Sequence, residues 1–257
     1  MHFLHVKLDA AQARAAALRR FYGDELGFPD VRGKSKGPVF EVGTTVIEFT
    51  PIDRGRPFYH FALRVPRNRF TAAREWLGEQ TELLRDEESG ETTFRFDNWN
   101  ADACYALDPC GNIVELIAHH ELPEEGSEGT AFSADEILGL CELGLVGGDT
   151  RNMASALVTL GIPLWDGTVD EPGRLAFMGD REGVLILSPE GRGWMPTGRA
   201  AEEHPVEALV SGERDAKATL PGTAHRITMS SATGTTSKSL GQMISGSGSS
   251  WPGWSPT

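Results

Sequence analysis

The chain has 257 residues, of which 39% are hydrophobic and 24% charged, which is typical of one large or two small globular domains. Its net charge of −13 argues against nucleic acid and anionic membrane surfaces as partners, because both attract clustered Lys and Arg. The sequence contains no apolar stretch of about 20 residues, so no membrane span is expected. The first residues lack a signal-peptide pattern, and the three cysteines suggest no disulfide framework. We therefore expect a cytoplasmic protein.

The first unit, residues 1–52, predicts the order βαβββ. A strand over 3–8 alternates Leu, Val and Leu with Phe, His and Lys, and Asp9 follows as the cap of a helix. The apolar residues of that helix have helical spacing, and glycines end it: Ala11, Ala15, Leu18, Phe21, Tyr22, Gly23 and Gly27. Strands over 39–42 and 45–50 follow, and a small additional strand is predicted near Val31.

The second unit, residues 57–120, repeats this order. A strand over 59–65 leads to Pro66, which suits the first turn of a helix that continues to Leu77. Three further strands are predicted at 92–96, 103–107 and 112–118. Repetition on this scale is the main guide to the architecture, and residues 1–121 are therefore expected to form one domain.

A linker rich in Glu and Gly, residues 122–132, leads to a third and degenerate unit within residues 133–229. Its predicted elements are a strand at 141–146, a helix at 152–160 ended by Gly161, and strands near 175–178 and 184–187. Residues 230–257 are dominated by Ser, Gly and Thr, so they predict a disordered tail.

The turn Asp108-Pro109-Cys110-Gly111-Asn112 runs directly into the strand Ile-Val-Glu-Leu-Ile, which carries Glu115 among β-forming residues. A buried carboxylate is costly unless it is paired, protonated or bound to a metal. Similar strands carry His5, Glu48 and His60, and in each case the opposite strand face is apolar. We therefore expect His5, Glu48, His60 and Glu115 to line one cup, with the two units related by a pseudo-twofold axis.

Imidazole and carboxylate ligands suit one divalent ion of Zn, Ni, Co, Mn or Fe(II). Four protein ligands leave two positions of an octahedral ion for water or a bidentate oxygen substrate, and a displaced Glu48 or Glu115 could act as base. In the third unit, Glu142 and Leu187 stand at the corresponding positions, so that unit is expected to have lost its ligand pair.

Five further residues are candidates for substrate binding, each with a plainer alternative. By strand parity Lys7 and Arg64 face the cup and could bind an anionic group, or they could reach solvent. The aromatic residues Trp99 and Tyr105 could wall an apolar ligand or simply pack in the core. His119 shares the parity of Glu115, but a solvated histidine at a strand end is the alternative.

The βαβββ repeat, the His on each opening strand and the Asp-Pro-x-Gly-Asn-x-x-Glu-Leu motif resemble the vicinal oxygen chelate superfamily. This superfamily includes glyoxalase I, extradiol ring-cleaving dioxygenases, fosfomycin and bleomycin resistance proteins, and epimerases. The resemblance covers roughly residues 1–120 well and 137–190 weakly. It implies an α+β fold in which the first two modules form a cupped mixed β-barrel and the third is a metal-free appendage.

The resemblance also implies a function. Glyoxalase-I-like members use a pattern that His5, Glu48, His60 and Glu115 supply, which implies lyase or isomerase chemistry on a small oxygen-chelating substrate. Extradiol dioxygenases use Fe(II) with two His and one Glu, which His5, His60 and Glu115 would provide without Glu48. Metal-free members bind drugs, so a binding or resistance protein is a further alternative. The third module lacks a fourth copy, and its open sheet edge predicts a homodimer.

Overall fold

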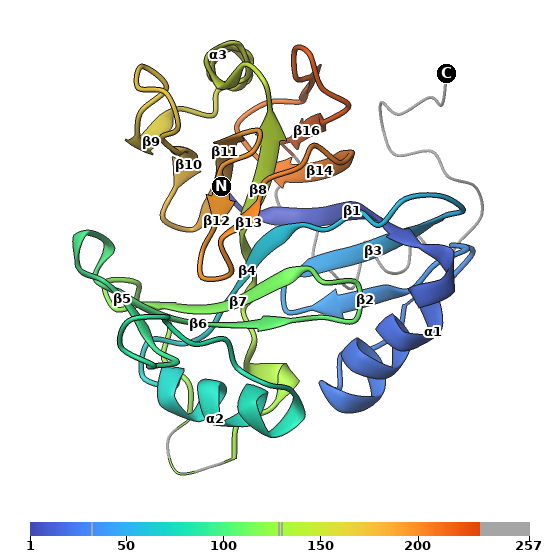
Figure 1. The fold of residues 1–257 in the computed structure, drawn as a ribbon, viewed down its shortest axis with the longest axis vertical. Coiled ribbons are helices and arrows are strands. Elements are labelled where there is room, and N and C mark those ends of the chain that lie inside the picture. Colours follow the sequence, from blue (N-terminus) through green and yellow to red (C-terminus); the bar gives the residue numbers. More distant parts are fainter. Residues whose placement is uncertain (32, 128, 130, 232–257) are drawn as a thin grey trace.

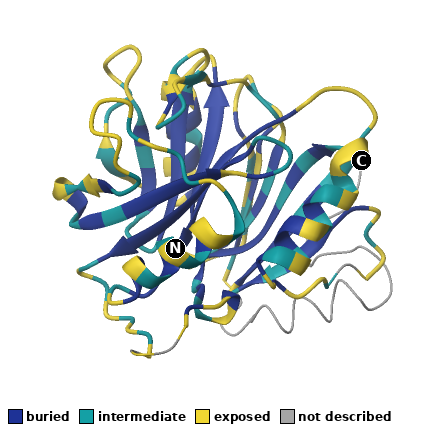
Figure 2. Cartoon of the chain, turned by 60° about the horizontal axis from the view of Figure 1, so that its bottom comes forward, coloured by how far each residue is buried: buried dark blue, intermediate teal, exposed yellow. Residues whose placement is uncertain are grey.

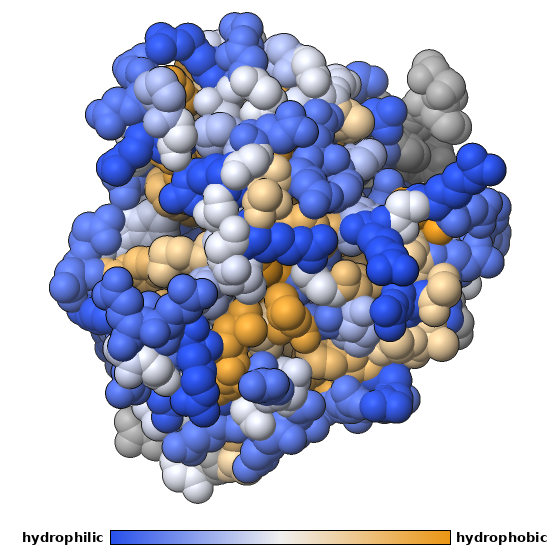
Figure 3. All heavy atoms as spheres, viewed as in Figure 1, coloured by the Kyte–Doolittle hydropathy of each residue, from blue (hydrophilic) through white to orange (hydrophobic). Residues whose placement is uncertain are grey.

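The computed structural model describes residues 1–31, 33–127, 129 and 131–231. Within these residues the chain is α+β, with two large curved sheets and few helices (Figure 1). None of the helices described is long and apolar enough to cross a membrane. Hydrophilic side chains dominate the face seen in Figure 3, interrupted by a hydrophobic area in its lower centre. The two curved sheets with few helices confirm the predicted α+β fold class.

The first unit contains β1 (Phe3–Ala11), β2 (Val39–Val42) and β3 (Thr45–Ile52). Its helical segment consists of a 3-10 turn at Gln12–Arg14, α1 (Ala15–Leu18) and a π-helical turn at Arg19–Glu25. The prediction that Asp9 caps this helix is wrong, because β1 continues past it and its backbone N–H donates to the Tyr59 hydroxyl at 3.0 Å. Gly23 lies within the last turn rather than ending it.

The strand predicted near Val31 is reduced to one bridge between Asp30 and Phe40.

The second unit has the predicted order, and its elements are β4 (His60–Arg64), α2 (Phe70–Gln80), β5 (Phe94–Phe96), β6 (Ala101–Leu107) and β7 (Ile113–His119). The turn before β7 is built on Asp108, whose carboxylate accepts the backbone N–H groups of Cys110 at 2.8 Å and Asn112 at 3.0 Å. Gly111 adopts a φ of +81°, which is the conformation that glycine tolerates best.

The third unit is more complete than expected. It contains β8 (Gly139–Gly147), α3 (Thr150–Leu160), β9 (Leu164–Gly167), β10 (Ala176–Asp180) and β11 (Gly183–Pro189). Asp149 caps α3 by accepting the Asn152 N–H at 3.0 Å, and Gly161 ends it at a φ of 100°, as predicted. The short strand β9 was not predicted, and it gives this unit the full βαβββ order.

The residues after β11 also form strands that were not predicted: the hairpin of β12 (Gly193–Trp194) and β13 (Arg199–Ala200), then β14 (Val206–Ser211), β15 (Ala216–Thr219) and β16 (Arg226–Ser230). The last three strands resemble a fourth unit without a helix. The predicted tail began at Ser230, which instead ends β16, and residues 232–257 lie outside the described part of the chain.

The units pair differently from the prediction. Sheet A has the order β15-β16-β14-β1-β3-β2, and sheet B has the order β5-β6-β7-β4-β8-β11-β10-β9. The first unit therefore pairs with the C-terminal strands through β1 and β14, whereas the second pairs with the third through β4 and β8. The expectation that the first two units share one cup, with the third as an appendage, is wrong. β4 covers the edge of β8, whereas β9 of the third unit lies at an edge of sheet B, and the homodimer stays a prediction.

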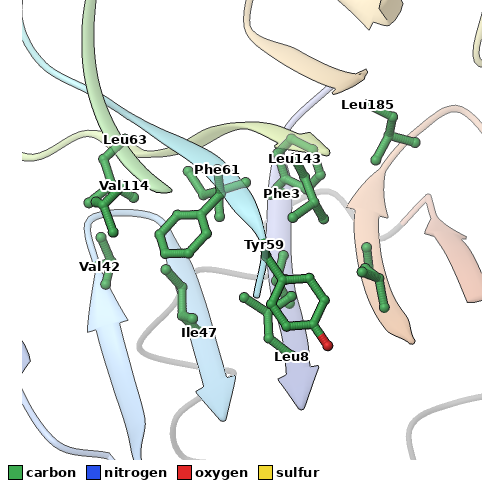
Figure 4. Packing of buried hydrophobic residues seen from close by; sticks show 14 of the residues in the cluster. Phe3, Leu8, Val42, Ile47, Tyr59, Phe61, Leu63, Val114, Leu143 and Leu185 are labelled. Atoms are coloured by element: carbon green, nitrogen blue, oxygen red, sulfur yellow. The ribbon is translucent and has the colours of Figure 1, made fainter. Parts of the chain in front are cut away.

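The two sheets pack against each other through one large hydrophobic core (Figure 4). Val6 and Ile47 of sheet A and Phe61, Leu63 and Val114 of sheet B belong to this core. A second cluster, which includes Tyr105, Ile117, Val184 and Trp194, covers the other face of sheet B. In Figure 2 the strands are largely buried, whereas the loops and the outer helix faces are exposed. Both sheets therefore place one face in the shared core and turn the other away from it.

Sheet B curls so that its two edges approach each other. Trp99, next to β5, lies 4.7 Å from the Phe177 ring of β10, and its indole N–H donates to Asp166 of β9 at 2.6 Å. The face that carries the second cluster is therefore the concave inside of a half-barrel. Side chains on this face are the ones that can form an enclosed site.

Candidate functional site

A row of paired residues crosses the concave face of sheet B. Tyr105 pairs with Glu115, Glu115 with Ala62, and Ala62 with Glu142. Residues opposite each other in adjacent strands point to the same face, and so does His60, two residues before Ala62. The strand register thus brings one imidazole, two carboxylates and one phenol to the same part of the half-barrel. The methyl group of Ala62 is the only side chain between the two carboxylates in this row.

These four side chains are almost completely buried. His60 is 6% exposed, Glu115 2% and Glu142 3%. The His60 Nε2 atom lies 3.0 Å from Oε2 of Glu115, and the Tyr105 hydroxyl donates a hydrogen bond to Glu115. Among the described residues, His60 Nδ1 and Glu142 Oε1 have no hydrogen-bond partner. Buried polar atoms without partners are costly, so these two atoms are candidates to bind a ligand.

Burial controls the charges of this site. It raises the pKa of Glu115 to about 8, against the smaller effect of the hydrogen bond from Tyr105. It likewise raises the pKa of Glu142 to about 8, and the negative charge of Glu115 adds to the effect while His60 opposes it. Burial lowers the pKa of His60 to about 4, although Glu142 acts in the other direction. The imidazole is therefore neutral at pH 7, while both carboxyl groups retain protons near neutrality.

The hairpin of β12 and β13 covers this site. Trp194 stacks on the ring of His60 with centroids 5.0 Å apart and planes 28° apart. Gly144 of β8 makes room for the indole, because a Cβ atom at that position would lie 2.8 Å from Trp194 Cη2. A cavity of only about 10 Å³ remains beside them, lined by residues such as His204 and His225. Trp194 therefore occupies the space above the imidazole.

The other predicted pair, His5 and Glu48, lies in sheet A. His5 Nε2 is 3.2 Å and Lys7 Nζ 3.5 Å from Oε2 of Glu48, and the Ser35 hydroxyl donates to Oε1 at 2.9 Å. Burial alone would raise the pKa of Glu48, but the hydrogen bond and charge of His5, together with Lys7 and Ser35, lower it to about 2. Glu48 is thus an ionised carboxylate that already has a cationic partner within this chain.

The expected single centre of four ligands is not formed. His5 and Glu48 point away from the shared core on sheet A, because their neighbours Val6 and Ile47 point into it. His60 and Glu115 point away from the same core on sheet B. In the part of the chain that the structure describes, no three His, Cys, Asp or Glu side chains are arranged to hold a metal ion. The pseudo-repeat was read correctly, but its two copies face in opposite directions.

Of the five residues predicted to bind substrate, Tyr105 lies in the site. Lys7 is paired with Glu48, and Arg64 lies on the concave face but forms an ion pair with Glu124 at 3.2 Å. Trp99 helps to close the half-barrel. His119 is 2% exposed, so it is not the solvated histidine of the alternative reading.

The His119 ring lies 6.4 Å from that of Trp99. Burial lowers its pKa to about 4, and the charges of Arg181 and Arg64 add to this effect. His119 is therefore neutral at pH 7 and belongs to the interior of the half-barrel.

Two residues of the site were missed. Glu142 occupies the position of His5 and His60 in the third unit, so the repeat did contain a signal, but the change of residue type was read as loss of function. Trp194 lies in a segment without periodicity, and no local signal places it on His60.

The search of family models and the search of curated proteins found no match. Among solved structures, the chain is similar to a Bacillus subtilis protein assigned as a dioxygenase, with 15% identity over 94% of this chain and 90% of that one and a TM-score of 0.54. It is also similar to glyoxalase I from Zea mays, with 14% identity over 95% of both chains and a TM-score of 0.53. The chain therefore has the fold of the vicinal oxygen chelate superfamily, which confirms the predicted resemblance at the level of the fold.

Proposed function

We propose that this chain is an enzyme of the vicinal oxygen chelate type, with a glyoxalase-like lyase or isomerase reaction on a small oxygen-chelating substrate. Its centre is formed by His60, Glu115 and Glu142 on the concave face of sheet B. One observation carries the proposal: two carboxyl groups and an imidazole are buried together without a cationic side chain in hydrogen-bond contact among the described residues. Such an arrangement costs stability, and groups with strongly shifted pKa values in one enclosed place are typical of functional sites.

The donor types of these three side chains suit a divalent metal ion, although in the described structure they are not gathered around one point. Imidazole nitrogen with carboxylate oxygen suits Zn, Ni, Co, Mn or Fe(II), and His60 Nδ1 and Glu142 Oε1 are buried donor atoms without partners among the described residues. An ion held by these residues would act as a Lewis acid that polarises the oxygen atoms of a chelating substrate. His60, Glu115 and Glu142 replace the set predicted from the sequence, which included His5 and Glu48.

The side chains themselves account for proton transfer. Burial makes the Glu142 carboxylate a stronger base than an ordinary carboxylate, so in its ionised form, which a bound divalent cation would favour, Glu142 could accept a proton from a carbon next to a carbonyl group. Glu115 is oriented by hydrogen bonds with Tyr105 and His60. Burial raises the pKa of Tyr105 well above 10, so its hydroxyl remains a donor. Trp194 excludes water from the imidazole, and access for a substrate requires the β12–β13 hairpin to move.

The second candidate is a metal-free binding protein, which is favoured by the packing of Trp194 against His60. The extradiol dioxygenase alternative required His5, His60 and Glu115 around one iron, and His5 lies on the other sheet. Nothing in the arrangement of the described residues favours that alternative.

The test is metal content after the purified chain is incubated with each of the five metals and dialysed. We expect about one ion per chain for at least one metal, and loss of that ion in the His60→Ala and Glu142→Gln variants. His5→Ala and Glu48→Gln are matched controls on the opposite face and should retain it. Absence of metal in every case would favour the binding protein, and loss only in the His5 and Glu48 variants would place the ion on sheet A and overturn the proposed centre.

A further inference from the structure

An open cavity of about 830 Å³ lies where the ends of β1 and β3 meet the turn between β6 and β7. Three arginines from three separate segments line it: Arg14 follows β1, Arg56 links β3 to β4, and Arg199 lies on β13. We call this cavity the arginine groove. It does not include His60, Glu115 or Glu142, and its size is in the range of sites for small molecules.

The cations of the arginine groove are available for a ligand. Arg14 and Arg56 are exposed, and neither forms an ion pair or a side-chain hydrogen bond with any residue that the structure describes. Arg199 is held in place without a carboxylate, because its guanidinium lies 3.3 Å from the centre of the Phe58 ring and donates to the Gly111 carbonyl at 3.3 Å.

Two acidic residues also line the arginine groove, but they do not balance these cations. Asp108 is buried, and its carboxylate accepts the hydroxyl of Tyr22 at 2.9 Å, the amide of Asn112 at 2.7 Å and two backbone N–H groups. Asp53 is exposed and is the one carboxylate left to face three guanidinium groups. In a chain with a net charge of −13, such an excess of cations is a local feature, because charges beyond a Debye length of about 8 Å are screened.

We propose that the arginine groove binds a small molecule with at least two anionic groups, either phosphates or carboxylates. Guanidinium groups bind both through paired hydrogen bonds, and three of them on separate segments suit more than one anionic group. Arg199 pairs across the hairpin with Trp194, which covers His60, so a ligand on Arg199 would also contact the segment that closes the half-barrel. This site does not depend on the function proposed for His60, Glu115 and Glu142.

The test is isothermal titration calorimetry of the full chain with pyrophosphate and with citrate, at equal ionic strength. We expect saturable binding of one molecule per chain by at least one probe. Arg14→Ala and Arg56→Ala should each raise the dissociation constant about tenfold, the usual effect of losing one charge-assisted contact. Arg54→Ala is the matched control, because Arg54 is exposed and close in sequence but does not line the cavity. Preference for one probe identifies the anionic group.

Two results would overturn the proposal. One is the absence of saturable binding of either probe at about 1 mM, well above typical metabolite dissociation constants. The other is an equal loss of binding in Arg54→Ala, which would show a general effect of surface charge. Far-UV circular dichroism melts of each variant establish that the fold is retained. Metal content is measured separately, so failure of the metal centre and failure of the arginine groove give different results.

Discussion

Replacement of Glu142 with Gln tests the charge balance of the half-barrel directly. Gln has the same size, and Glu142 Oε1 has no hydrogen-bond partner to lose among the described residues. The folded chain holds the Glu142 proton up to about pH 8, whereas the unfolded chain releases it near 4.5. The folded state therefore binds more protons between these values, and its stability falls as the pH rises through that window.

The size of the effect follows from the two pKa values. The interval from 4.5 to about 8 corresponds to roughly 5 kcal/mol at about 1.36 kcal/mol per pKa unit. Buried sites relax and admit water when they become charged, so we expect about half of this in a measurement. The pKa of Glu115 is raised in the same way, so Glu115 should still destabilise the Glu142→Gln variant at high pH. This effect should be smaller than in wild type, because the variant lacks the charge of Glu142.

The assay is urea unfolding of chelator-treated protein from pH 6.5 to 9. His60 has a pKa of about 4 in the folded chain and 6.5 in the unfolded chain, so near pH 6.5 it makes stability rise slightly with pH; this contribution is present in wild type and in both variants and does not affect their comparison. Wild type should lose stability as the pH rises, and Glu142→Gln should lose clearly less. Glu213→Gln, on an exposed residue, should behave like wild type. Equal slopes in all three proteins would refute the idea that Glu142 is a buried titrating group.

Three further outcomes are expected. Trp194→Ala should lower the free energy of unfolding by about 3–5 kcal/mol in urea titrations, because it removes the ring stacked on His60. The same variant should speed the modification of His60 by diethyl pyrocarbonate, and an unchanged rate would contradict the idea that Trp194 shields His60. Gly144→Ala should destabilise by about 1–3 kcal/mol in the same titrations, because its Cβ would meet Trp194. Glu48→Gln should cost up to about 3 kcal/mol of stability at pH 7, since the lowered pKa of Glu48 contributes stability above pH 4.5 that is lost as the pH falls through about 2. Between these pH values the free energy of unfolding should change less with pH in the variant than in wild type.

The local elements were predictable because their signals are local. Strand alternation located β2 with its observed bounds and set the correct face of β1, β3, β4 and β7. Gly161 ended α3 because only a residue that tolerates positive φ fits there. The first helical segment was harder, because β1 runs on through Asp9 and a π-helical turn accommodates Gly23, and neither feature has a clear pattern in the sequence.

The pairing of the units was not predictable from this pattern. Parity states which residues share a face of a strand, but it says nothing about which strand lies next to it. The free edge of β4 could have met the first unit, and in the structure it meets β8. The strand β14, which pairs with β1, and the strand β16, which pairs with β14, were not predicted, although β14 alternates buried and half-buried residues. One wrong choice of neighbour was enough to separate His5 and Glu48 from His60 and Glu115.

The same choice explains why Glu142 was overlooked. Within the third unit alone, a carboxylate in place of histidine and Leu187 in place of glutamate suggest a lost site. Once β8 pairs with β4, however, Glu142 comes opposite Ala62, which is also the partner of Glu115. A larger residue than alanine at position 62 would separate the two carboxyl groups, so its small side chain is part of the site. In a fold of paired repeats, the two halves of a site come from different units, and a ligand can only be judged absent after its partner unit is known.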